Sequence, residues 1–94
     1  MNIEFVSPES IITVQGMYVE LYTIAGFIAV YQDHAPLIAP LVAQKDIVVY
    51  SENSSQRQFV AHDAIAHIER TGVTIIASHI HEKSARPNSN RISF

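Results

Sequence analysis

The stretch Gly26-Phe-Ile-Ala-Val-Tyr-Gln-Asp-His-Ala-Pro-Leu-Ile-Ala-Pro-Leu41 decides how this chain folds. It consists of a short apolar run, a polar interruption and a second apolar run. The apolar residues predict one strand over 27–30 and a second over 37–41. The polar segment Gln32-Asp33-His34 cannot be buried in the middle of a strand, so we expect it to lie exposed between the two.

Proline makes the corner between these strands stiff. Pro36 holds its own φ at about −65° and lacks an N–H group, and it biases Ala35 towards an extended conformation. Asp33 and His34 therefore stand at the tip of a constrained loop. A rigid scaffold that presents a fixed polar loop is typical of a binding surface.

Composition limits the possible functions. The chain has 94 residues, which is enough for one domain, and 48% of them are apolar, which is enough for a core. The net charge is −3 and there is no basic stripe, so we expect no nucleic-acid partner. Cysteine is absent, which excludes disulfides and thiolate metal sites. No apolar run approaches the ~20 residues of a spanning helix, and the first residues lack the pattern of a secretory signal. We therefore expect a soluble domain kept in the cytoplasm.

The rest of the chain repeats the pattern of short strands. Apolar alternation or β-branched composition is separated by turn residues, and no window shows a sustained helical period. The pattern predicts an all-β sandwich or barrel of about eight to ten short strands. The runs, besides the two above, are 3–5, 11–14, 17–22, 47–50, 56–61, 65–69 and 73–77.

The end of the chain differs from the rest. Residues 82–91 are almost entirely polar and have little to bury. We predict a β-sandwich domain over 1–80 and a polar tail over 81–94 that is mobile or only loosely docked.

Five histidines raise the question of a metal or catalytic site. On a strand, His79 and His81 would share one face, and neutral imidazoles suit zinc or copper. Surface histidines are nevertheless the favoured interpretation, and we predict no metal site. His62 and Asp63 could pair as base and orienting carboxylate, but neighbouring strand residues point to opposite faces and no nucleophile motif is near.

The other usual catalytic patterns are missing from the sequence. The three glycines are far apart and form no phosphate-binding loop, and no carboxylate pair is placed for acid–base work. We therefore predict no catalytic residues, no cofactor and no enzymatic activity.

Three segments, in order along the chain, resemble the epsilon subunit of the rotary ATP synthase. They are Val6-Ser7-Pro8-Glu9, the central stretch, and the ending Val73-Thr74-Ile75-Ile76-Ala77. The family's central signature is roughly Gly-x-Phe-Gly-Val-Leu-Pro-Gly-His-Ala-Pro-Leu. Its last four residues, His-Ala-Pro-Leu, occur unchanged here as His34-Ala35-Pro36-Leu37. The resemblance covers about residues 3–78.

The chain also departs from the family pattern. Gln32-Asp33 replaces the Pro-Gly before the histidine, and Ala29 replaces an earlier glycine. Aspartate tolerates a left-handed backbone better than most residues, so position 33 can keep its turn. Phe27 replaces an acidic residue that is common in the family just before its phenylalanine, and His62-Asp63-Ala64 replaces a Ser-Gly-Gly segment.

The resemblance implies a flattened β-sandwich of about ten strands at the foot of the central stalk. It implies a non-catalytic rotor subunit of a proton- or sodium-translocating synthase, which joins the gamma subunit to the membrane c-ring. The subunit would lie peripherally at the cytoplasmic face of the inner membrane. The implied c-ring contacts are Asp33, His34, Ala35 and Pro36. The implied gamma contacts are Leu37, Ile38, Leu41, Val73 and Ile75.

Family members usually carry a C-terminal helical hairpin, which can restrain ATP hydrolysis. This sequence stops where that hairpin would begin. We therefore expect any inhibitory role to be absent or much reduced.

The lost glycines also permit a degenerate copy of the epsilon subunit, which folds but no longer assembles. Two further interpretations remain open at this point. The first is a stand-alone β-sandwich interaction module that would not co-purify with gamma. The second is a small metal-dependent β-barrel enzyme using His79, His81 and either His34 or His62.

Overall fold

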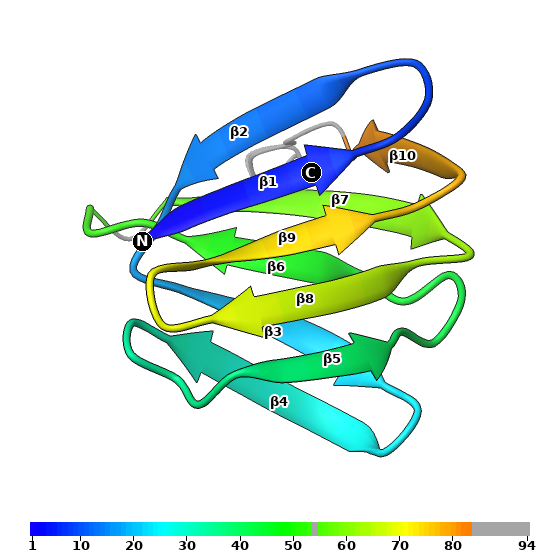
Figure 1. Ribbon diagram of the computed structural model, residues 1–94. Coiled ribbons are helices and arrows are strands. Elements are labelled where there is room, and N and C mark those ends of the chain that lie inside the picture. Colours follow the sequence, from blue (N-terminus) through cyan, green and yellow to red (C-terminus); the bar gives the residue numbers. More distant parts are fainter. Residues whose placement is uncertain (54, 84–94) are drawn as a thin grey trace, which may run out of the picture.

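The computed structural model describes residues 1–53 and 55–83, which form ten strands (Figure 1). The predicted polar tail falls largely outside the described residues. The strands are β1 Asn2–Val6, β2 Ile11–Gln15, β3 Tyr18–Thr23, β4 Gly26–Tyr31, β5 Leu37–Pro40, β6 Ile47–Tyr50, β7 Gln56–His62, β8 Ile65–Glu69, β9 Gly72–Ile76 and β10 His79–Glu82.

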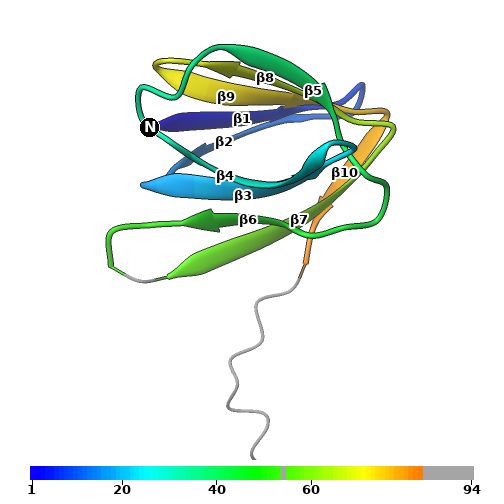
Figure 2. The ribbon, with the colours of Figure 1, turned by 90° about the horizontal axis from the view of Figure 1, so that it is seen from below.

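The strands build two five-stranded sheets that lie face to face (Figure 2). The first sheet has the order β2-β1-β9-β8-β5, and the second has the order β10-β7-β6-β3-β4. Neighbouring strands are antiparallel except for β1 and β9, which run parallel. The all-β sandwich predicted from the sequence is confirmed.

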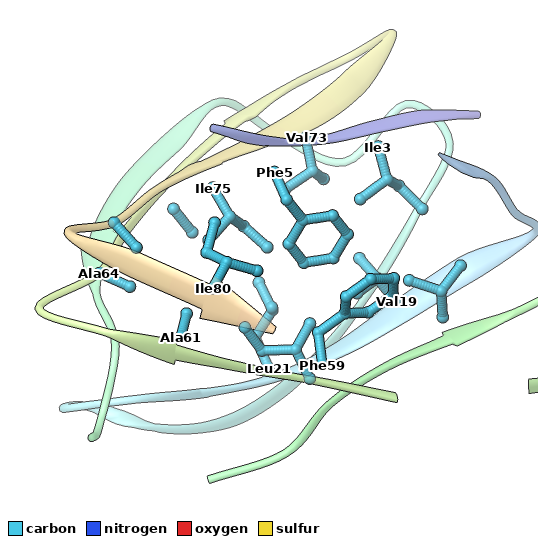
Figure 3. Close-up of a cluster of buried hydrophobic side chains, with 14 of the residues drawn as sticks. Ile3, Phe5, Val19, Leu21, Phe59, Ala61, Ala64, Val73, Ile75 and Ile80 are labelled. Atoms are coloured by element: carbon cyan, nitrogen blue, oxygen red, sulfur yellow. The ribbon is translucent and has the colours of Figure 1, made fainter. Parts of the chain in front are cut away.

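The core lies between the sheets and follows from the period-two alternation (Figure 3). Ile3 and Phe5 point inward from β1, while Val19 and Leu21 point inward from β3. The ring of Phe5 stacks on the ring of Phe59 across the two sheets, with centroids 4.1 Å apart. Offset aromatic stacking of this kind joins the layers at the centre of the domain.

The central stretch connects the two sheets. Strand β4 is an edge of the second sheet, and β5 is an edge of the first. The polar corner between them therefore carries the chain from one layer to the other. The second predicted strand is shorter than expected, because Leu41 follows β5 and makes only an isolated bridge to Thr23.

The last two strands described, β9 and β10, lie in different sheets. Strand β9 lies beside the N-terminal strand, with Phe5 opposite Ile75. Strand β10, which the sequence did not separate from the end of the domain, pairs with β7 as an edge strand. Only Ile80 of β10 is buried.

Candidate interaction surfaces

The polar corner, residues 32–36, is held by backbone hydrogen bonds at its tip. Asp33 has a φ of 70°, so the backbone is left-handed at the position where the family has glycine. The N–H of Asp33 donates to the carbonyl oxygen of Arg70 over 2.9 Å, and the N–H of His34 donates to that of Tyr31 over 3.2 Å. The hydrogen bond from Asp33 ties the corner to the turn between β8 and β9 in the first sheet.

The side chains of the corner are available to a partner. Asp33, Ala35 and Pro36 are exposed, and His34 is half-buried. His34 Nδ1 lies 2.6 Å from the carbonyl oxygen of Ala35, the geometry of a hydrogen bond from Nδ1–H. This bond leaves Nε2 as the free ring nitrogen of His34.

An apolar row crosses the outer face of the first sheet at one end. The strand register places one residue from each strand in line: Val6 is opposite both Ile11 and Ile76, and Ile65 is opposite both Ile76 and Pro40. We call Ile11, Val6, Ile76, Ile65 and Pro40 the apolar row. Three of its isoleucines are strongly exposed: 67% for Ile11, 52% for Ile76 and 46% for Ile65. Ile38, 66% exposed, lies on the same face two residues before Pro40.

The gamma contacts implied by the resemblance fall in different environments. Leu37 and Ile38 are exposed, at 42% and 66%, and Leu41 is partly buried against the core. Val73 and Ile75, in contrast, are only 2% and 0% exposed and point into the core. Side chains alternate along β9, so their outward neighbour Ile76 is the residue of this strand that a partner could touch.

The polar corner and the apolar row lie at opposite ends of the first sheet. Strand β8 runs from Ile65, in the row, to Glu69, next to the Arg70 carbonyl that holds the corner. Four steps along a strand span about 13 Å. In Figure 1 the turn between β8 and β9 lies at the left and the start of β8 at the right. Two partners could therefore bind the sheet at the same time.

Tyrosines cover part of the outer face of the second sheet. The ring of Tyr18 stacks between those of Tyr31 and Tyr50, with centroids 4.6 Å and 4.5 Å away. The hydroxyl of Tyr50 donates to Glu20 Oε1 over 2.9 Å. The pKa of Tyr50 is raised, mainly because the phenol is partly desolvated and in second place because it donates a hydrogen bond to the carboxylate of Glu20. The protonated, hydrogen-bonded phenol is thereby favoured, which suits a structural role for this ladder.

The four histidines considered above as metal ligands lie in two places. His62, His79 and His81 gather on the outer face of β7 and β10, whereas His34 follows β4 at the opposite edge of the same sheet. With the side chains as they lie, residues 1–53 and 55–83 contain no group of three histidine or acidic side chains set to hold a metal. None of these residues belongs to a helix long and apolar enough to cross a bilayer.

Comparison with known proteins agrees with the fold and the motifs. The family model for the ATP synthase delta/epsilon chain β-sandwich domain matches residues 1–83. A search of curated protein sequences found no significant match. Among solved structures, the fold is similar to a chain in the Euglena gracilis mitochondrial ATP synthase, a cryo-EM structure of OSCP, F1 and c-ring in rotational state 1.

That similarity has a TM-score of 0.76 at 18% sequence identity and covers 85% of this chain. It covers 51% of the other chain, so the present chain spans about half the length of its structural relative. At 18% identity the structural similarity shows a shared fold. The family model, in contrast, matches the amino-acid sequence itself, over a range that includes all the residues that the structure describes. The chain belongs to the family of ATP synthase delta/epsilon β-sandwich domains.

Proposed function

We propose that this domain is a non-catalytic rotor component of an ATP synthase, which couples the gamma subunit to the c-ring. The observation that carries the proposal is the apolar row, a line of outward-facing apolar residues across all five strands of one sheet, exposed in four of them and partly buried at Val6. Contiguous apolar surface of this kind marks a protein-binding site more often than a free surface. Membership in the delta/epsilon family supports the choice of gamma as the partner of this row.

The apolar row and Ile38 form the gamma-facing surface in this proposal. Ile76 and Ile65 lie near its centre, in the middle strands of the sheet, where a partner would desolvate them fully. Residues at the centre of an interface contribute most of the binding free energy. Leu37 belongs to the same edge strand but shares the face of the buried Ala39, so it lies at the margin of this surface, at the end nearest the polar corner.

The polar corner faces the c-ring in this proposal, through Asp33, His34, Ala35 and Pro36. Its left-handed backbone and its bond to Arg70 hold these side chains in one arrangement. A fixed loop loses little conformational freedom on binding, which favours affinity for a loop-shaped polar partner. Strand β8 runs from the apolar row to the turn that holds the corner, and the close-packed core beneath it lets the sheet transmit force without yielding.

The proposed role requires no reaction chemistry from this chain. ATP synthesis would take place elsewhere in the assembly, and this domain would lie at the cytoplasmic face of the inner membrane, attached through its partners. Whether protons or sodium ions drive the rotor is decided by the c-ring.

The test is binding of the chain to purified gamma subunit and c-ring from the same source. We expect Ile76→Asp to weaken gamma binding at least about tenfold, because a carboxylate would be buried without a partner. Leu37→Asp, at the margin, should have a smaller effect. His34→Ala should weaken c-ring binding and leave gamma binding intact.

Gln56→Asp is the matched control, since it adds the same charge at an exposed position on the other sheet. It should leave both affinities unchanged. Equal losses from Ile76→Asp and Gln56→Asp would contradict the assigned surface. A wild-type chain that binds neither subunit would support the stand-alone interaction module instead.

A further inference from the structure

We propose that His62, His79 and His81 form a binding site for one transition-metal ion, of the zinc or copper class, on the outer face of β7 and β10. The sequence alone places His79 and His81 on one face and offers either His34 or His62 as a third imidazole, and the fold selects His62. His62 lies directly opposite His79 in the β7–β10 ladder, and His81 is two residues further on the same face.

The three rings lie close together. Their centroids are 5.6 Å apart for His62 and His79, 5.9 Å for His79 and His81, and 6.4 Å for His62 and His81. With metal–nitrogen distances of 2.0–2.1 Å, imidazoles that share one tetrahedral ion have centroids roughly 5 Å apart. Closing the cluster therefore requires side-chain rotations that bring each pair nearer by about 1 Å, and no movement of the strands.

The side chains are free to make these rotations. His79 and His81 are exposed, and His62 is partly exposed. Within the part of the chain that the structure describes, the ring nitrogens of these three residues make no hydrogen bond. An ion would thus compete only with water for their lone pairs.

The backbone beneath the cluster is fixed. Ser78 donates its N–H to the carbonyl oxygen of His62 over 2.9 Å, and its hydroxyl lies 3.1 Å from the same oxygen and 3.0 Å from Asp63 Oδ2. These contacts tie the end of β7 to the start of β10. The Cα atoms that carry His62 and His79 are therefore set before any ion arrives.

Ligand chemistry selects the class of metal. Three neutral imidazoles with one position left to water suit zinc, copper or nickel, whereas magnesium and calcium prefer oxygen ligands. The site lies on the sheet opposite to the apolar row, so a bound ion would leave the proposed gamma surface open.

The experiment is titration of the 94-residue chain with zinc alone, followed by calorimetry, and with cobalt, followed by its visible absorption. We expect one ion per chain and a cobalt spectrum of nitrogen-ligand tetrahedral type. Replacing His79 or His81 by asparagine should weaken zinc binding at least about tenfold, since even the loss of a residue that only orients a ligand typically costs about 10–100-fold in affinity. Excess zinc should raise the unfolding midpoint of the wild type and not that of the double variant His79→Asn/His81→Asn.

His67→Asn is the matched control, because His67 is an exposed strand histidine on the other sheet. It should bind zinc as the wild type does. His62→Asn should weaken zinc binding as well. If this variant does not fold, the double variant His79→Asn/His81→Asn still tests whether the histidines bind zinc, and its unfolding curve without metal shows that it is folded. A wild type that binds no zinc, or a double variant that binds it equally well, would overturn the proposal.

Discussion

Asp33 shows how one residue maintains a turn that the family makes with glycine. Its φ of 70° is costly for most side chains, by roughly 1–2 kcal/mol, and least so for glycine, asparagine and aspartate. We predict that Asp33→Val lowers the free energy of unfolding by about 1–2 kcal/mol, while Asp33→Gly changes it by less than about 0.5 kcal/mol. Urea denaturation measures both. Equal losses would mean that the carboxylate, and not the backbone angle, is what the turn requires.

The ion pair of Arg57 and Glu82 joins β7 to β10 and makes stability depend on pH. Two guanidinium nitrogens donate to the two carboxylate oxygens over 2.7 Å, and these hydrogen bonds lower the pKa of Glu82. The folded state therefore favours the ionised form. The contribution is complete above the usual glutamate pKa of about 4.3 and is lost as the pH falls through the lower folded value.

Both partners of this pair are partly exposed, so its contribution is small. We predict that Glu82→Gln lowers the free energy of unfolding by about 0.2–1 kcal/mol at neutral pH. At about pH 3 the wild type and the variant should differ less. Denaturant curves at the two pH values check this. A difference that grows in acid would contradict the assigned sign.

The parallel pair of β1 and β9 depends on the absence of a side chain at Gly72. A β-carbon there would overlap the carbonyl oxygen of Asn2, which is backbone and cannot move aside cheaply. We predict that Gly72→Ala lowers the free energy of unfolding by about 1–3 kcal/mol. Thr71→Ala, at the exposed neighbouring position, should have little effect. Urea denaturation of both variants checks the prediction, and similar losses would show that the contact is easily relieved.

Elements with a strong local signal were predictable from the sequence. The runs 47–50 and 65–69 coincide with β6 and β8. β-Branched and aromatic composition between turn residues marks the first, and alternation of apolar and polar residues marks the second together with its buried face. Strand β10 carries a single buried residue, Ile80, so its alternation gives no such signal. The pairing of β1 with β9 is equally invisible locally, since it joins the two ends of the domain.

The candidate surfaces were predictable only in part. The polar corner follows from Gln32 to Pro36 alone, because nothing so polar can be buried in a strand. Val73 and Ile75 point inward because their face of β9 meets the second sheet. The sequence of one strand does not say which of its two faces is buried. The third histidine of the cluster, His62, becomes a neighbour of His79 only through the β7–β10 register.

At the scale of the whole molecule, stability rests on the packing between the sheets. Phe59 is fully buried and stacks on Phe5 from the opposite sheet. We predict that Phe59→Ala lowers the free energy of unfolding by about 3–5 kcal/mol, a large part of the total for a domain of this size. Phe27→Ala removes an aromatic ring that is 50% exposed and should cost about 1 kcal/mol or less. Chemical denaturation distinguishes the two, and comparable losses would contradict the layered core.

The position of β1 has a consequence for how the protein is made. This strand leaves the ribosome before the other nine described strands, yet it lies between β2 and β9, and Asn2 pairs with Gly72. The first sheet therefore cannot close while synthesis is still short of β9, and until then the nascent chain holds a hairpin with one unpaired edge. Translation that stalls in this interval would leave an aggregation-prone chain with an unpaired strand edge, which chaperones would have to bind. Slowed elongation before residue 72 should therefore increase aggregation more than slowed elongation after it.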